Sequence, residues 1–246
     1  MSLKRLEGRI ALVTGASKGI GRAIAMAYAA EGAHIIAIAR DTAGLESLDD
    51  AINGLGGSAT LVPMDLTEWA AIDGLAAPLL ERYGRLDALV GNAGMLGQLS
   101  PMGHFPPDVW EQAFKLNVHA NWRLIRALDP LLRASDAGRV LFVTSGITRV
   151  ASPFWGLYGA TKAALEKMAE TYAVEMKQTK VRVNVINPGP TRTAMRAGAF
   201  PGEDPMTLPA PEEIMEGFIQ AVMPQFDGNG LWIAADEIAK ASRTVN

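Results

Sequence analysis

The sequence predicts an α/β fold: a doubly wound parallel sheet of about seven strands, with helices on both faces in three layers. Short apolar runs rich in β-branched residues recur along the chain, and most are continuously apolar, as in strands buried on both faces. Longer segments with helical periodicity separate them, and this alternation is typical of a parallel sheet. The strands are expected at residues 10–14, 34–39, 59–64, 86–91, 139–144, 181–186 and 230–234.

Helices are expected between the strands, for example at residues 19–32, 69–84 and 108–135. Gly32 and Gly84 stand where two of these helices should end, because glycine readily adopts the left-handed conformation that closes a helix. In a doubly wound order with right-handed crossovers, ligands bind at the carboxyl ends of the strands. The candidate site is therefore expected among residues that directly follow strands.

A single domain is expected over residues 1–246, since no linker or break in composition divides the chain. With 246 residues, 49% of them hydrophobic, the chain is long enough to bury a full core. The regular pattern lapses at about 190–212, a segment rich in proline, glycine and methionine. A long irregular segment in a compact domain is typical of a substrate lid or a mobile loop.

Composition argues against several kinds of partner and site. The net charge of -3, without runs of like charge, gives no reason to expect nucleic acid or a membrane surface. The absence of cysteine excludes disulfides, thiolate metal sites and a cysteine nucleophile. The histidines are scattered without ligand spacing, so no metal site is expected. The N-terminus lacks the apolar region of a signal peptide and no apolar stretch reaches about 18 residues, so a cytoplasmic protein is expected.

The stretch "TGASKGIG" follows the first expected strand and places Gly15, Gly19 and Gly21 at the start of a helix. Glycines permit a tight turn and close approach of the backbone to a pyrophosphate, and the helix N-terminus supplies free N–H groups. The spacing differs from the common dinucleotide fingerprint, because three residues separate the first two glycines. Simple packing of strand against helix is the alternative, and the position directly after the first strand favours dinucleotide binding.

The choice of cofactor is expected to depend on the end of the second strand, "AIARD". An acidic residue there would accept hydrogen bonds from the adenosine ribose of NAD, but Ala39 stands in that place and Arg40 follows. Lys18 lies in the glycine turn, so two cations could flank a ribose phosphate. This arrangement favours NADP(H). NAD(H) stays open, since Arg40 could instead be solvated while Asp41 begins a turn.

Three polar residues in "SGITRVASPFWGLYGATKAAL" form a candidate catalytic group. Ser145 follows the fifth expected strand, whereas Tyr158 and Lys162 stand four residues apart and share one face if their segment is helical. An ammonium group near a phenol favours the phenolate, and such a phenol can act as general acid or base. A serine hydroxyl beside it can donate to the same substrate oxygen. Packing and solvation remain the alternative for each residue taken alone.

Six motifs occur in the order and spacing of one family, and the chain resembles the short-chain dehydrogenases/reductases over residues 6 to about 195. The resemblance is to the single-domain branch with the Thr-Gly-x-x-x-Gly-x-Gly and Tyr-x-x-x-Lys motifs, which implies a Rossmann-type fold. The motifs are "TGASKGIG", "NAG" at 92–94, "LNV" around Asn117, "TS" at 144–145, "YGATK" at 158–162 and "NPGPTRT" at 187–193.

The resemblance implies roles for individual residues. Tyr158 would be the acid/base, and Lys162 would lower its pKa and bind the nicotinamide ribose. Ser145 would hold the substrate oxygen, and Asn117 would support a water in a proton relay. The implied cofactor-binding residues, with Asp65 at the adenine and Thr193 near the carboxamide, are Gly15, Ser17, Lys18, Gly19, Ile20, Gly21, Arg40, Asp65, Leu66, Asn92, Ala93, Gly94, Tyr158, Lys162, Pro188, Gly189, Thr191 and Thr193.

The leading hypothesis is an NADP(H)-dependent oxidoreductase that transfers hydride between the nicotinamide and a small-molecule carbonyl/alcohol pair. A 3-oxoacyl-thioester reductase is the alternative within this class, and Arg192 and Arg196 could bind an acidic substrate group or be solvated. A non-catalytic dinucleotide sensor is the alternative from another class, although such a protein would tolerate loss of residues that this chain retains.

Two features depart from the family's common pattern. The usual Val-Asp-Gly-Gly ending is replaced by "DGNGLWIAADEIAKASRTVN", which puts the common tetramer in doubt and leaves a homodimer or a homotetramer open. Trp155 stands three residues before Tyr158, where it could pack internally or form one wall of the substrate pocket.

Overall fold

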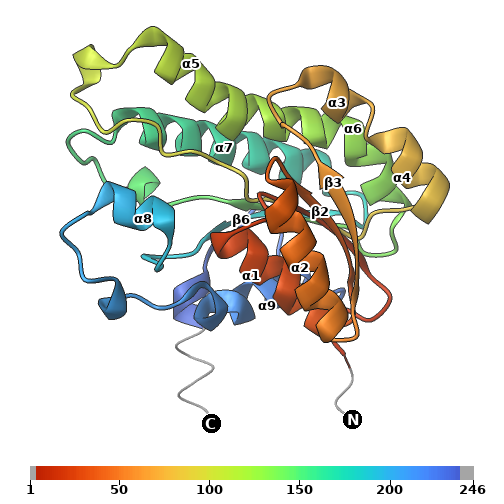
Figure 1. Ribbon diagram of the computed structural model, residues 1–246. Coiled ribbons are helices and arrows are strands. Elements are labelled where there is room, and N and C mark those ends of the chain that lie inside the picture. Colours follow the sequence, from red (N-terminus) through yellow and green to blue (C-terminus); the bar gives the residue numbers. More distant parts are fainter. Residues whose placement is uncertain (1–3, 239–246) are drawn as a thin grey trace.

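The computed structural model describes residues 4–238 and confirms the expected parallel sheet (Figure 1). The strand order is β3-β2-β1-β4-β5-β6-β7, with every neighbouring pair parallel. The order reverses between β1 and β4, which creates a crevice at the carboxyl ends of the strands. The strands are β1 (Ile10–Thr14), β2 (His34–Ala39), β3 (Ser58–Pro63), β4 (Ala88–Gly91), β5 (Arg139–Val143), β6 (Arg182–Asn187) and β7 (Trp232–Ala234).

Successive residues of each central strand face two different cores. In β1, Ala11 and Val13 belong to one buried cluster and Leu12 to the other, as the two-residue period of a strand requires. The first cluster is covered by α1 (Gly19–Ala30), α2 (Thr42–Gly54) and α9 (Met215–Val222), below the sheet in Figure 1. The second is covered mainly by α4 (Ala76–Tyr83), α6 (Ala120–Ala134) and α7 (Gly156–Glu175), above it.

Two of the expected helices are divided in the structure. The segment 69–84 forms α3 (Trp69–Asp73) and α4, with Gly74 as the C-cap of α3. The segment 108–135 forms α5 (Pro107–Phe114), a π-helical turn at Lys115–His119, and α6. The expected helix ends at Gly84 and Gly32 are confirmed, since these glycines have φ of 72° and 93°. No helix among the described residues is long and apolar enough to cross a membrane.

The irregular segment 190–212 contains short regular pieces. It forms α8 (Ala194–Ala199) and 3₁₀ turns at Pro205–Thr207 and Pro211–Ile214. Thr193 caps α8, because its hydroxyl oxygen accepts a hydrogen bond from the Arg196 N–H at 3.2 Å. The expected last strand is present as β7, whereas residues 239–246 of the atypical ending lie outside the described part of the chain.

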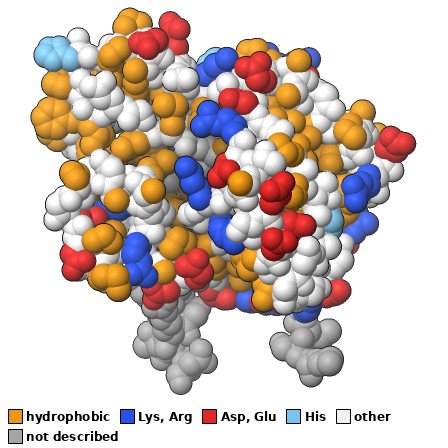
Figure 2. All heavy atoms as spheres, viewed as in Figure 1, with side chains coloured by type: hydrophobic (Ala, Val, Ile, Leu, Met, Phe, Trp, Pro, Cys, Tyr) orange, Lys and Arg blue, Asp and Glu red, His pale blue; other side chains and the backbone are white. Residues whose placement is uncertain are grey.

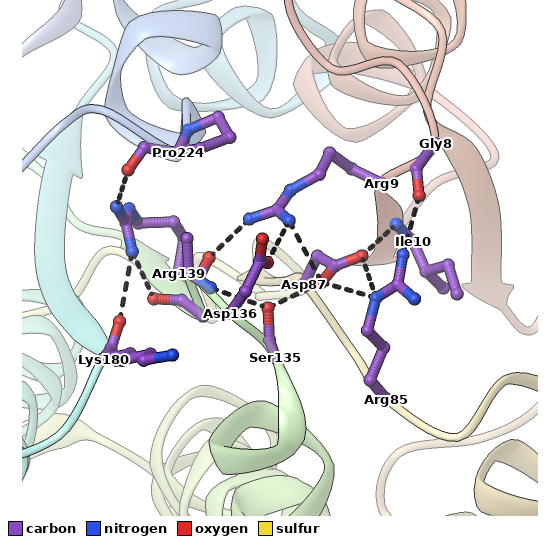
Figure 3. Close-up of polar contacts among 12 residues, drawn as sticks. Gly8, Arg9, Ile10, Arg85, Asp87, Ser135, Asp136, Arg139, Lys180 and Pro224 are labelled. Carbon is purple, nitrogen blue, oxygen red and sulfur yellow. Dashed lines mark hydrogen bonds and ion pairs between the residues drawn. The ribbon is translucent and has the colours of Figure 1, made fainter.

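A buried polar cluster joins the amino ends of β1, β4 and β5 (Figure 3). Asp87, only 1% exposed, precedes β4 and accepts hydrogen bonds from the Ile10 N–H at 2.9 Å and the Ser135 hydroxyl at 2.6 Å. Its carboxylate also accepts from Arg85 Nε at 3.0 Å and lies 3.5 Å from Arg9 Nη1. One carboxylate therefore links the strand starts and pairs with two cations, of which Arg9 also pairs with Asp136.

Arg139 extends this cluster toward the end of the sheet (Figure 3). Its buried guanidinium donates to the carbonyl oxygens of Gly138, Lys180, Met223 and Pro224. Burial lowers the pKa of Arg139 to about 10, and the charges of Arg182 and Arg9 act in the same direction. The side chain thus ties β5 to the segments that follow α7 and α9, using backbone acceptors rather than a carboxylate.

We expect the change Asp87→Asn to lower the free energy of unfolding by about 3 kcal/mol, because it leaves Arg9 and Arg85 without their buried counter-charge. Asp73→Asn is the matched control: Asp73 is 41% exposed and pairs with Arg123 at 2.7 Å, so we expect a loss of about 1 kcal/mol or less. Urea unfolding of both variants checks this. Equal losses would contradict the role of Asp87 as the buried link.

Candidate active site

A cleft of about 770 Å³ lies at the carboxyl ends of the central strands, next to α8. It collects every expected cofactor-binding residue and three of the four expected catalytic residues. The expected residues that line it are Gly15, Ser17, Lys18, Gly19, Ile20, Gly21, Arg40, Asp65, Leu66, Asn92, Ala93, Gly94, Ser145, Tyr158, Lys162, Pro188, Gly189, Thr191 and Thr193. Within the described residues, no group of three potential ligand side chains is placed to hold a metal ion.

The glycine turn requires glycine for two physical reasons. Gly15 and Gly19 have φ of 66° and 56°, in the left-handed region that side chains disfavour. A Cβ atom on Gly21 would lie 2.2 Å from the Gly15 carbonyl oxygen, so the turn closes only without a side chain there. Lys18, the N-cap of α1, makes no side-chain capping bond. The uncapped helix start lies in the cleft and suits an anionic group.

Asn92 joins β4 to β1 beneath the glycine turn. Its side-chain amide donates to the Thr14 carbonyl oxygen at 2.8 Å. Its backbone N–H and that of Ala93 both donate to the Thr14 hydroxyl oxygen at 3.0 Å. These bonds hold the ends of the two central strands together where the crevice opens.

The end of β2 carries an available cation. Arg40 is 74% exposed at its side chain, and its nearest acidic group is Asp65 at 3.6 Å. One oxygen of Asp65 already accepts from the Thr67 N–H and hydroxyl, both at 2.8 Å. Asp41 caps α2 by accepting from the Gly44 N–H at 3.0 Å, so it begins a helix rather than a simple turn.

Lys162 is buried within α7, with 4% of its surface exposed. Its Nζ donates to the Val143 carbonyl oxygen at 2.8 Å and lies 5.6 Å from the centre of the Tyr158 ring. Burial lowers the pKa of Lys162 to about 8, although the charge of Glu166 opposes that shift.

Burial raises the pKa of Tyr158 to about 12. The expectation that Lys162 draws this pKa downward stays a prediction, and burial is the influence that dominates in the protein alone. The phenol loses hydration on entering the protein, and the Lys162 ammonium group donates to the Val143 carbonyl oxygen.

Ser145 stands two residues after the end of β5 and caps the start of the 3₁₀ turn Gly146–Arg149. Its hydroxyl oxygen accepts from the Ile147 N–H at 3.4 Å, which leaves the hydroxyl hydrogen to be donated to another group. Asn187, at the end of β6, accepts from the N–H groups of Gly146 at 3.1 Å and Gly189 at 3.3 Å. One amide oxygen thus aligns the loops after β5 and β6.

Asn117 does not line the cleft, unlike the other expected catalytic residues. It is fully buried in the π-helical turn, where its amide oxygen accepts from the Met95 N–H at 2.9 Å. Its amide nitrogen donates to the Met95 carbonyl at 2.9 Å and to the Thr161 hydroxyl at 3.0 Å. These contacts connect the segment after β4 to α7, so the expected support of a water by Asn117 stays a prediction.

Glu166 lies in α7 beside the site, and none of the sequence motifs identified it. Its buried carboxylate accepts hydrogen bonds from Thr144 at 2.5 Å, Thr148 at 2.8 Å and Trp232 Nε1 at 3.0 Å. Arg149 lies 3.3 Å away. Its four-residue spacing from Lys162 was the available signal, because it places both side chains on one face of α7.

Trp155 contributes to the cleft wall and also packs against neighbouring rings. It stacks on Phe200 of the 190–212 segment, with ring centres 5.6 Å apart, and meets Tyr158 edge-on at 6.1 Å. Trp155 thus packs against neighbouring rings and also forms part of the cleft wall, which combines the two alternatives given for it. Phe200 belongs to the 190–212 segment that was expected beside the substrate, although no motif singled out this residue.

Comparison with known proteins finds relatives over most of the chain. The family described as short chain dehydrogenase matches residues 9–204. The uncharacterized oxidoreductase YciK of Escherichia coli K12 is 44% identical over 213 residues, 85% of this chain and 84% of YciK. A short chain dehydrogenase structure from Shigella flexneri 2a, complexed with NADP, has a TM-score of 0.92 at 40% identity and covers 96% of this chain, with 100% of that chain covered. One from Escherichia coli CFT073, complexed with NADPH, has a TM-score of 0.89 at 40% identity, with 96% and 99% covered.

We expect the change Lys162→Met to raise the free energy of unfolding at pH 7 by about 1 to 3 kcal/mol, because it removes the cost of burying a charge. Between pH 8 and pH 10.5, the unfolded chain holds a proton on Lys162 that the folded chain has lost. The stability of the unsubstituted protein therefore rises over that interval. The difference in the free energy of unfolding between Lys162→Met and the unsubstituted protein shrinks accordingly.

Urea unfolding at pH 7 and pH 10 without cofactor checks this expectation. Lys167→Met, on the exposed face of the same helix, is the control and should show no such pH dependence. A loss of stability in Lys162→Met that is the same at both pH values would contradict it.

Proposed function

The chain belongs to the short-chain dehydrogenase family and is an oxidoreductase acting on a CH–OH/C=O pair, and from this premise we propose that it uses NADP(H), with Tyr158 as the acid/base. The observation that carries the proposal is the convergence of Ser145, Tyr158 and buried Lys162 on the cleft that also contains the glycine turn.

The residues of the cleft fit a dinucleotide with a ribose phosphate. The uncapped start of α1 offers N–H groups to a pyrophosphate, and the glycines let the backbone approach it. Lys18 and Arg40 would neutralise the ribose phosphate. β2 ends in Ala39, so the acidic residue that would bind the ribose hydroxyls of NAD is not present at that position. The NADP and NADPH bound by the two similar structures support this choice.

The protein's own groups would manage the proton and the oxygen of the substrate. Bound NADPH supplies the hydride for the carbonyl carbon. Ser145 would donate a hydrogen bond to the carbonyl oxygen while Tyr158 delivers its proton there. Burial raises the pKa of Tyr158, so the phenol keeps its proton at neutral pH and is able to donate it to the carbonyl oxygen during reduction. Charged Lys162 would bind the nicotinamide ribose hydroxyls.

The proposal extends to the organisation of the protein. Residues 1–246 would form one dinucleotide-binding domain, with the segment of about 190–212 as its substrate lid. The protein would act in the cytoplasm on a small molecule, as a homodimer or homotetramer.

We expect Tyr158→Phe to lower kcat for NADPH-dependent reduction of carbonyl compounds by about 10²- to 10⁴-fold, because the proton donor is lost. The Kd for NADPH should change by less than about threefold, since the ring itself is kept. Tyr172→Phe is the control on the same helix: its hydroxyl bonds Asp129 at 2.7 Å, and activity should be retained. Full activity in Tyr158→Phe would refute the assignment.

We expect Arg40→Asp to reduce the ratio of kcat/KM for NADPH over NADH by about tenfold or more. The change removes a cation and places a carboxylate next to the ribose phosphate, while it offers NADH a partner for its ribose hydroxyls. Steady-state kinetics with both cofactors measure the ratio. Arg126→Asp, on the exposed side of α6, should leave it unchanged, and an unchanged ratio in Arg40→Asp would defeat the NADP(H) assignment.

A further inference from the structure

The end of the cleft beyond Tyr158 has apolar walls. Val150, Met195 and Phe200 line it and remain 61%, 42% and 37% exposed. Figure 2 shows hydrophobic side chains at the surface on the side of the molecule where α5 and α8 lie. Large hydrophobic side chains left open to water around a cleft indicate that an apolar ligand covers them.

Aromatic rings connect this end of the cleft to the proposed acid/base. Trp155 meets the Tyr158 ring edge-on, and Phe200 stacks on Trp155 with an angle of 30° between the ring planes. A carbonyl group at the Tyr158 hydroxyl would therefore have a flat apolar surface beside it. A planar substituent gains both apolar burial and ring stacking in this place.

The cations of the cleft either bond to protein acceptors already or lie at its adenosine end, away from the apolar walls. Among the cations that line the cleft in the described residues, Lys18 and Arg40 belong to the adenosine end, and Lys162 faces the Val143 carbonyl. Arg196 is the cation next to Phe200.

Arg196 is neutralised by Glu203. Its Nε and Nη2 donate to the two carboxylate oxygens of Glu203, both at 2.7 Å. Its guanidinium lies 3.7 Å from the centre of the Phe200 ring. The bond from Arg196 lowers the pKa of Glu203, so both members of the pair are charged near neutral pH. A carboxylate on a substrate would have to give up its hydration here without gaining a free cation.

We infer that the substrate is an uncharged ketone or aldehyde whose carbonyl carries an apolar group, which packs against the stacked rings of Trp155 and Phe200. This inference rests on the proposed function. The carbonyl carbon accepts a hydride from NADPH and the oxygen accepts the Tyr158 proton, which yields an alcohol and NADP⁺; water returns the proton to Tyr158. The Arg196–Glu203 pair excludes acidic substrates of similar shape.

Matched carbonyl compounds that differ in charge test this inference. The rates of NADPH oxidation would be compared for 4-acetylbenzamide and 4-acetylbenzoate, and for the corresponding formyl compounds. The amide and the carboxylate have nearly the same shape, so the comparison isolates charge. We expect kcat/KM to be at least about tenfold higher for the uncharged member of each pair, equivalent to about 1.4 kcal/mol.

Two substitutions test the residues named. Glu203→Gln releases Arg196, so the ratio of kcat/KM for carboxylate over amide should rise about tenfold. Glu212→Gln, an exposed acid of the same segment, should leave that ratio unchanged. Trp155→Ala should lower kcat/KM for acetophenone about tenfold or more while the Kd for NADPH stays within about threefold.

The outcomes separate the two proposals. If no ketone or aldehyde oxidises NADPH, the proposed function fails, and this inference fails with it. If carbonyl compounds are reduced but the carboxylates are preferred, or if Glu203→Gln leaves the ratio unmoved, only the inference on the substrate is overturned.

Discussion

The hydrogen bond from Lys162 Nζ to the Val143 carbonyl oxygen fixes the relation between α7 and the end of β5. Ser145 stands two residues after Val143, and Tyr158 stands one helical turn before Lys162. This bond therefore sets where the serine hydroxyl and the phenol lie relative to each other. It forms in a buried place where the ammonium group is unfavourable, so the surrounding structure has to compensate for its burial.

Two other buried side chains, those of Asn117 and Glu166, hold α7 in place around Lys162. Asn117 bonds Thr161, the residue before the lysine, and Glu166 bonds Thr144, the residue after Val143. The same helix is thus held against β5 from one side and against the segment after β4 from the other. Far from the cleft, Asp87 joins the opposite ends of the strands, so strand alignment and site geometry depend on separate clusters.

Much of this arrangement could be predicted from sequence, because buried parallel strands are continuous apolar runs and their following residues meet at one edge. The runs at 10–14 and 34–39 coincide with β1 and β2, and the motif residues share one cleft. The π-helical turn, the Arg196–Glu203 pair and the raised pKa of Tyr158 could not be predicted. They depend on hydrogen bonding, chain folding and burial that no local pattern records.

The π-helical turn constrains the length of the chain as well as its composition. From Pro107 to Ala134 the backbone stays helical, but the wider turn at Lys115–His119 offsets the faces of α5 and α6. Each residue of an α-helix rotates the chain by about 100°, so deleting one residue would turn Asn117 away from Thr161 while α6 kept its apolar face on the sheet. A single-codon deletion in this segment would therefore break the connection to α7.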